Sequence, residues 1–133
     1  MNDRIDTRVY AMLNSDNLIM ETLSQWVLIE HEGKSVTALM REMGYQTIGI
    51  YGHGYLGQLL ERTTDKREVT VKCVIDRKYD GSDGFHISLE QDLPKMDAII
   101  VTSPYYFKEI RRDIEQRDYV GEIRSLDELL YQL

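Results

Sequence analysis

Three glycines spaced Gly-x-Gly-x-x-Gly follow an apolar run in the segment TIGIYGHGYLGQLLE, residues 47–61. The apolar run predicts a strand, the glycines a tight turn, and the leucine-rich remainder a helix. In such a unit Gly52 permits the turn out of the strand. Gly54 leaves the backbone open to a phosphate, and Gly57 lets the helix pack closely on the sheet. The segment therefore predicts the opening βα unit of an α/β domain.

An acidic residue stands where a nucleotide-binding unit of this kind needs one. The β-branched run VTVKCVID, residues 69–76, predicts a second strand that ends in Asp76. Asp76 follows Gly57 at about the 20-residue interval expected of a ribose-binding acid. Its carboxylate can accept hydrogen bonds from the ribose hydroxyls and would repel a 2′-phosphate. NADP remains a candidate ligand because the adjacent Arg77 is a cation that could accommodate the 2′-phosphate.

The rest of the chain continues the alternation of strands and helices. HIS predicts a very short strand at 86–88, the capping-box spacing of SLEQ one helical turn at 88–91, and MDAIIVT a buried strand at 96–102. SPYYFKEIRRDIEQR predicts a helix with Ser103 as N-cap and Pro104 as its first residue. A strand near 122–124 and a capped terminal helix at 125–133 complete the chain. The apolar stripe of the helix after Ser103 is Phe107, Ile110 and Ile114.

The chain begins with a helical region over residues 1–45. Apolar residues recur there at helical spacing, and Ser35 and Gly44 occupy the N-cap and C-cap positions of a second helix. The stripe of the first helix is Ile19, Leu23, Trp26, Val27 and Ile29, with Trp26 expected in the core. The sequence thus predicts a Rossmann-like three-layer α/β sandwich with a parallel sheet of four to five strands. The chain is expected to comprise an N-terminal helical extension (1–45) and a single compact domain (46–133).

Composition narrows the class of function. The formal charge of −7 argues against a protein that coats nucleic acid, because that task needs a basic face. The single cysteine, Cys73, excludes an intramolecular disulfide and reads as a buried apolar filler. The N-terminus lacks a secretory signal pattern, and no apolar run reaches membrane-spanning length. We therefore expect a soluble, cytoplasmic protein with no membrane span and no nucleic-acid partner.

The predicted ligand site lies at the carboxyl ends of the strands that begin near Thr47 and Met96, where the strand order reverses. The free N–H groups and the positive dipole at the helix start supply an anion site. His53 is either a phosphate donor or a solvated loop residue. The candidate binding residues are Gly52, His53, Gly54, Tyr55, Leu56, Gly57, Asp76, Arg77, Thr102 and Ser103.

No catalytic constellation accompanies this site. The histidines His31, His53 and His86 are scattered without metal-ligand spacing, so no metal is expected. No serine stands in a Gly-x-Ser-x-Gly motif, and no Tyr-x-x-x-Lys pair follows the strand that ends near Thr102. A second domain that would contact a substrate is also missing, which argues against a complete stand-alone oxidoreductase.

Nearly the whole chain resembles a known group of domains. SQWVLIEHEGKSVTALMREMGYQTIGIYGHGYLGQLLE, VKCVIDRK, DLPKMDAIIVTSPYYFKEI and IRSLDELLY resemble small Rossmann-type nucleotide-binding domains of bacterial surface-polysaccharide (capsule and lipopolysaccharide) biosynthesis proteins. The chain is more distantly similar to the N-terminal nucleotide-sugar-binding domain of sugar acetyltransferases, whose catalytic domain it lacks. That resemblance implies ligand contacts from Gly52, Gly54, Tyr55 and Asp76, with Thr102 and Ser103 opposite.

A shorter resemblance concerns the stretch after the third long strand. VTSPYYFKEI resembles the end of the fourth strand of glucose-fructose oxidoreductase-like dehydrogenases, where a Thr-Pro pair borders the nicotinamide. Here Ser103 is inserted between Thr102 and Pro104, so the pair is interrupted.

Three functions follow as hypotheses. The first is an auxiliary nucleotide-binding protein for NAD(H) or a nucleotide-sugar, associated with a glycosyltransferase or another polysaccharide enzyme. The second is an interaction or oligomerisation module with an empty glycine loop, in which the N-terminal helices form a homodimer. The third is an oxidoreductase half-enzyme that a partner chain completes.

Overall fold

The computed structural model describes residues 7–131, with side chains described from residue 16 onward. The expected helical structure of residues 1–6 and 132–133 lies outside the described residues. The elements follow in the order α1 (Thr7–His31), α2 (Val36–Glu42), β1 (Thr47–Tyr51), α3 (Tyr55–Thr63), β2 (Thr70–Ile75), β3 (His86–Ile87), β4 (Ala98–Val101), α4 (Phe107–Glu115), β5 (Glu122–Ser125) and α5 (Leu126–Leu130).

The five strands form one parallel sheet in the order β3-β2-β1-β4-β5. β1 is central, and Tyr51 at its end pairs with Ile75 of β2 and with Val101 of β4. The strand order reverses between β1 and β4, which is the topological switch point of a doubly wound sheet. The predicted Rossmann-like α/β fold with an N-terminal helix is confirmed.

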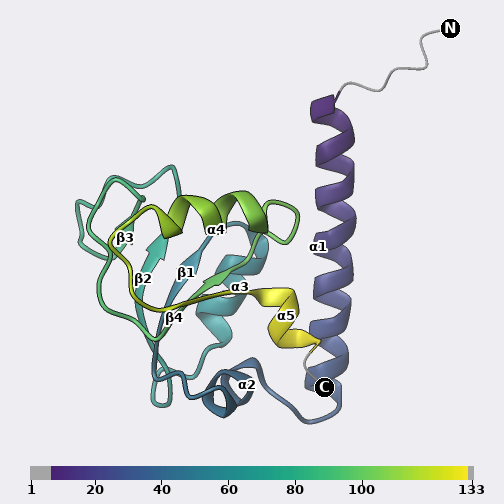
Figure 1. Ribbon diagram of the computed structural model, residues 1–133. Coiled ribbons are helices and arrows are strands. Elements are labelled where there is room, and N and C mark those ends of the chain that lie inside the picture. Colours follow the sequence, from purple (N-terminus) through teal and green to yellow (C-terminus); the bar gives the residue numbers. More distant parts are fainter. Residues whose placement is uncertain (1–6, 132–133) are drawn as a thin grey trace, which may run out of the picture.

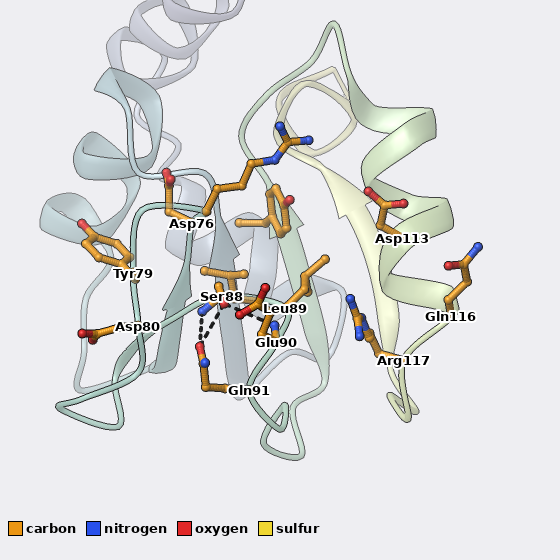
Figure 2. A pocket seen from close by; sticks show the side chains of 13 residues that line it. Asp76, Tyr79, Asp80, Ser88, Leu89, Glu90, Gln91, Asp113, Gln116 and Arg117 are labelled. Carbon is orange, nitrogen blue, oxygen red and sulfur yellow. Dashed lines mark hydrogen bonds between the residues drawn. The ribbon is translucent and has the colours of Figure 1, made fainter.

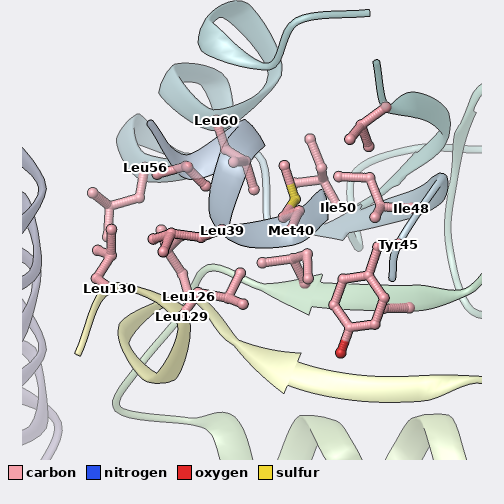
Figure 3. Close-up of a cluster of buried hydrophobic side chains, with 14 of the residues drawn as sticks. Leu39, Met40, Tyr45, Ile48, Ile50, Leu56, Leu60, Leu126, Leu129 and Leu130 are labelled. Atoms are coloured by element: carbon pink, nitrogen blue, oxygen red, sulfur yellow. The ribbon is translucent and has the colours of Figure 1, made fainter. Parts of the chain in front are cut away.

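One face of the sheet is covered by α2, α3 and α5, and α1 packs against α5 and joins the same core (Figures 1 and 3). Ile48 and Ile50 of β1 are fully buried beneath Met40 of α2 and Leu60 of α3. Trp26 of α1 is also buried, as predicted. The helical region before residue 45 and the sheet are therefore stabilised by one continuous core.

Within residues 7–131, the other face of the sheet carries α4 alone. Ile110 and Ile114 pack against Ile99 and Val101 of β4, and Cys73 of β2 is fully buried in the same cluster. Burial raises the pKa of the Cys73 thiol to about 11, so the cysteine is an unreactive apolar filler as expected. Chain segments without helix connect β2 to β3 and β3 to β4, so the β2–β3 side of this face has no second helix.

The predicted helix caps are confirmed at three positions. The Ser35 hydroxyl accepts the Ala38 N–H at 3.0 Å, and the Ser125 hydroxyl accepts the Glu128 N–H at 3.3 Å. Gly44 has a φ of +86°, the left-handed conformation that ends a helix at low cost for glycine.

Three expectations about local structure are wrong. α4 begins at Phe107, with Tyr106 rather than Ser103 at its N-cap, because the buried stripe that stabilises the helix starts only at Phe107. The 88–91 segment forms a hydrogen-bonded turn instead of a helical turn, since Gln91 accepts bonds from Ser88 itself. Val27 is 61% exposed, because Trp26 and Ile29 already fill the side of α1 that faces the core.

Candidate functional site

Two of the three glycines of the loop are required by the fold. Gly52 has a φ of +96°, and a Cβ there would lie 2.7 Å from the Thr102 hydroxyl. A Cβ on Gly57 would lie 1.8 Å from the Gly52 carbonyl oxygen, which forbids any side chain. Gly52 therefore allows the tight turn, and Gly57 allows the close approach of α3 to the end of β1, as the spacing predicts.

Gly54 has no such requirement. Its φ of −83° is available to every residue, and a Cβ built on it would meet nothing within 4 Å. It is the N-cap of α3, and no side chain caps this helix. The space beside Gly54 is therefore open, next to a helix start whose N–H groups attract anions.

The Asp76 carboxylate reaches back to the glycine loop. Its Oδ2 accepts the His53 N–H at 2.8 Å, and Oδ1 accepts the Lys78 N–H at a longer 3.3 Å. The acid is half-buried at the carboxyl end of β2. One oxygen thus orders the loop, while the other retains capacity to accept a further hydrogen bond.

The His53 side chain is held by hydrogen bonds at both ring nitrogens. Its Nδ1 lies 2.5 Å from the Tyr79 hydroxyl, and its Nε2 lies 2.7 Å from Glu61 Oε1. Only 13% of the side chain is exposed. The tyrosine ring in turn packs edge-on against His86. His53 therefore links the glycine loop to α3 and to the loop after β2, with both ring nitrogens engaged.

The remaining candidates lie around the same loop in different environments. Thr102 is buried, and its hydroxyl donates to the Tyr51 and Gly52 carbonyls at 2.9 and 3.0 Å. Leu56 is buried in the core, so only its backbone can face the site. Ser103 is half-buried, whereas Tyr55 is 89% exposed at the first position of α3.

A groove of about 720 Å³ opens at Tyr51 and Asp76, where β1 and β2 end, on the α4 face of the sheet (Figure 2). Of the predicted site residues, Asp76 and Arg77 line this groove, whereas those of the glycine loop do not. Asp76 lies at the end of β2, the 88–91 turn lies below it, and Asp113, Gln116 and Arg117 project from the α4 side. Its volume falls within the range of small-molecule sites. The groove occupies the flank of the sheet that no helix covers.

Both acidic and basic side chains line this groove. Among the described side chains, neither Arg77 nor Arg117 forms an ion pair. Burial raises the pKa of the Tyr51 hydroxyl, and the nearby charge of Arg77 opposes that shift. The nearby carboxylates of Asp113 and Asp76 act in the same direction as burial. Such a lining suits a ligand that offers hydroxyl or amide groups more than a bare anion.

The structure brings Asp76 and Arg77 together in the groove, and it places Thr102 in a structural role at the switch point. Sequence reasoning missed the walls contributed by the 88–91 turn, by Asp113 of α4 and by Arg117 just after that helix. Their polar residues follow no motif. One signal was available in the sequence, because no helix is predicted between Asp76 and the short strand at 86–88, which leaves that flank uncovered.

Among the described side chains, those of residues 16–131, no cluster of histidine, cysteine or acidic groups has the arrangement of a metal site. No helix over residues 7–131 is long and apolar enough to cross a bilayer. Comparisons with known protein families, with curated proteins and with solved structures found no match to this chain.

Proposed function

We propose that this chain binds a nucleotide, NAD(H) or a nucleotide-sugar, with its phosphates at the glycine loop and one ribose at Asp76. The observation that carries the proposal is the contrast within the loop. Gly52 and Gly57 are explained by the fold, whereas Gly54 is a glycine beside open space with no conformational need for it. A phosphate that approaches the backbone supplies the missing reason.

The groove supports the same proposal. It continues from Asp76 along the flank of the sheet, and its volume of about 720 Å³ accommodates a nucleoside-sized group. The carboxylate oxygen of Asp76 that holds only a long bond to Lys78 is the acceptor for a ribose hydroxyl. The uncharged groups of Gln91 and Gln116 offer both donors and acceptors to the remainder of the ligand.

Ligand binding is tested by thermal unfolding and calorimetric titration with NAD, NADP, a UDP-sugar and coenzyme A. A compound present at 100 times its dissociation constant stabilises the folded chain by about 2.7 kcal/mol. We expect NAD or the UDP-sugar to raise the melting temperature. A screen in which no compound shifts the melting temperature contradicts the proposal.

The variant Gly54→Ala locates the site. Because a methyl group meets nothing in the free protein, the unliganded variant should be as stable as the wild type or more stable by about 0.4–1 kcal/mol. The same methyl group should abolish the shift produced by the ligand. A variant that binds as tightly as the wild type would place the ligand elsewhere.

Asp76→Asn serves as the matched variant for the ribose. An amide oxygen can still accept the His53 N–H, so the loop should stay ordered, while the hydrogen bonds to the ribose hydroxyls weaken. Weaker binding of NAD with unchanged stability is the expected result.

The resemblance to polysaccharide-biosynthesis domains extends the proposal to an auxiliary, cytoplasmic role beside a glycosyltransferase or a related enzyme. A UDP-sugar that shifts the melting temperature more than NAD does would support that role. An interaction module is the second candidate function. The observation that favours it is the set of exposed apolar residues on α1, namely Met20, Val27 and Leu28.

A further inference from the structure

The β5 edge of the sheet is open. In the described part of the chain, β5 (Glu122–Ser125) pairs only with β4 and ends the strand order. A hollow of about 560 Å³ runs along it, lined by residues of α4, β5 and α5 and of the Tyr119–Gly121 approach to the strand. None of the described side chains of α1 contributes to this lining, and α5 lies between α1 and the sheet (Figure 1). An uncovered edge of this kind can pair with another strand.

The hydrogen-bonding groups at this edge are free at its centre. The Glu122 N–H donates to the Asp97 carbonyl at 3.0 Å, so the backbone of Glu122 faces β4. Strand alternation then turns the N–H and C=O of Ile123 outward. Outside the β4–β5 ladder, no backbone group of a described residue bonds to either group. One outward residue with both groups free is what an antiparallel partner needs for a reciprocal pair of hydrogen bonds.

The side chains on either side of Ile123 carry opposite charges. Glu122 and Arg124 lie on one face and form an ion pair at 2.9 Å. If a second β5 pairs antiparallel about Ile123, Glu122 lies opposite Arg124 of the copy, and Arg124 lies opposite its Glu122. The strand is therefore complementary in charge to its own reversed copy.

The rim of the hollow has the same property on the opposite face. Arg111 and Glu115 of α4 form an ion pair at 3.6 Å and both line the hollow. A two-fold axis perpendicular to the sheet sets α4 antiparallel to its copy, which presents the two charges in reversed order. Unlike charges thus meet on both faces of one two-fold arrangement.

From these observations we infer that two copies of this chain associate through β5, with antiparallel pairing centred on Ile123, into a continuous ten-stranded sheet. The outward N–H and C=O of Ile123 form the hydrogen bonds between the two strands. The order of Glu122 and Arg124 fixes which residues lie opposite one another. The glycine loop is not part of this surface, so dimer formation and nucleotide binding are separate properties.

The inference is tested with the whole chain by sedimentation velocity over a dilution series. Ile123→Pro removes the outward N–H without touching a bond to β4, and proline is tolerated on edge strands. We expect the wild type and Ile123→Val to be dimers, and Ile123→Pro to be a folded monomer by circular dichroism. A wild type that stays monomeric throughout, or an Ile123→Pro chain that still dimerises, overturns the inference.

Charge reversal gives an independent test. Arg124→Glu places like charges opposite one another and should raise the dimer dissociation constant at least about tenfold. The double variant Glu122→Arg/Arg124→Glu restores unlike pairs and should restore the dimer. A double variant no better than the single one contradicts the pairing. Loss of the dimer in Met20→Glu/Val27→Glu, with Arg124→Glu unaffected, would assign it to α1 instead.

Discussion

The two sides of the sheet are stabilised in different ways. From β1 through β4 to β5, helices cover the strands, and apolar side chains such as Leu60, Ile100 and Ile114 are fully buried. On the β2–β3 side, connections without helix are held by side-chain hydrogen bonds, including those of Gln91 to Ser88. The helix-covered side supplies a rigid frame, and the loop side leaves space beside it.

This difference explains where the groove lies. A helix between β3 and β4 would pack over the sheet next to α4 and fill that flank. The chain instead makes the 88–91 turn, whose backbone needs are met locally by Ser88 and Gln91. Polar groups lie there beside Tyr51 at the end of the central strand. The candidate site is thus a consequence of a missing helix.

The same substitution on each side provides the strongest test of this comparison. Leu60→Ala removes a fully buried side chain of α3 and should lower the free energy of unfolding by about 2–5 kcal/mol. Leu89→Ala, in the half-buried loop, should cost less than half as much. Urea denaturation measures both values. Equal losses would show that the loop side is as well packed as the helix-covered side.

A second prediction concerns the hydrogen bonds that replace the helix. Gln91→Ala leaves the Ser88 N–H without its acceptor at 2.8 Å, and Ser88 is buried. A buried donor left unsatisfied costs about 1–3 kcal/mol. Gln91→Glu keeps an acceptor oxygen and should retain most of the stability. If urea denaturation finds the two variants equally stable, the turn is not held by this side chain.

The fold could be predicted because its signals are local and agree with one another. The apolar run before Gly52, the β-branched run ending at Asp76 and the buried run at 96–102 each mark a central strand. The order of the strands followed from the alternation of strands with helices. The start of α4 was wrong because Ser103 and Pro104 suit an N-terminus locally, whereas burial begins at Phe107.

Much less of the site could be predicted. Asp76 and Arg77 were found because a motif fixes their distance from the glycines. Arg117 and Gln91 reach the groove from segments whose place depends on how the chain packs around a missing helix. No local pattern records that arrangement. The bonds of His53 to Tyr79 and Glu61 likewise join three segments that only the folded chain brings together.

A third prediction examines a side-chain bond on the helix-covered side. Thr102→Val keeps the shape of the side chain and removes the hydroxyl that donates to the Tyr51 and Gly52 carbonyls. The expected loss is about 0.5–1.5 kcal/mol, the usual net contribution of such a bond. Calorimetric titration with the ligand found in the screen should show unchanged affinity. A large loss of affinity with no loss of stability would instead make Thr102 a ligand contact.

The smallest effect concerns pH, and it lies in the loop side. A hydrogen bond from His86 to Asp83 at 2.6 Å, together with backbone N–H bonds, holds the pKa of that carboxyl far below its usual range. The folded state therefore binds the proton less readily than the unfolded chain. The resulting stability is fully present above the unfolded pKa, about 4, and is lost progressively as pH falls below it.

Asp83→Asn removes this dependence, so its unfolding midpoint in urea should fall less between pH 6 and pH 3 than that of the wild type. Asp97 is the matched control, since backbone N–H bonds from Gln46 and Thr47 lower its pKa on the helix-covered side. The unfolding midpoint of Asp97→Asn in urea should also fall less between pH 6 and pH 3 than that of the wild type. If only Asp97→Asn does so, the loop around Asp83 is already open in acid before the sheet unfolds. The two sides would then unfold separately, because their stabilising interactions are largely independent.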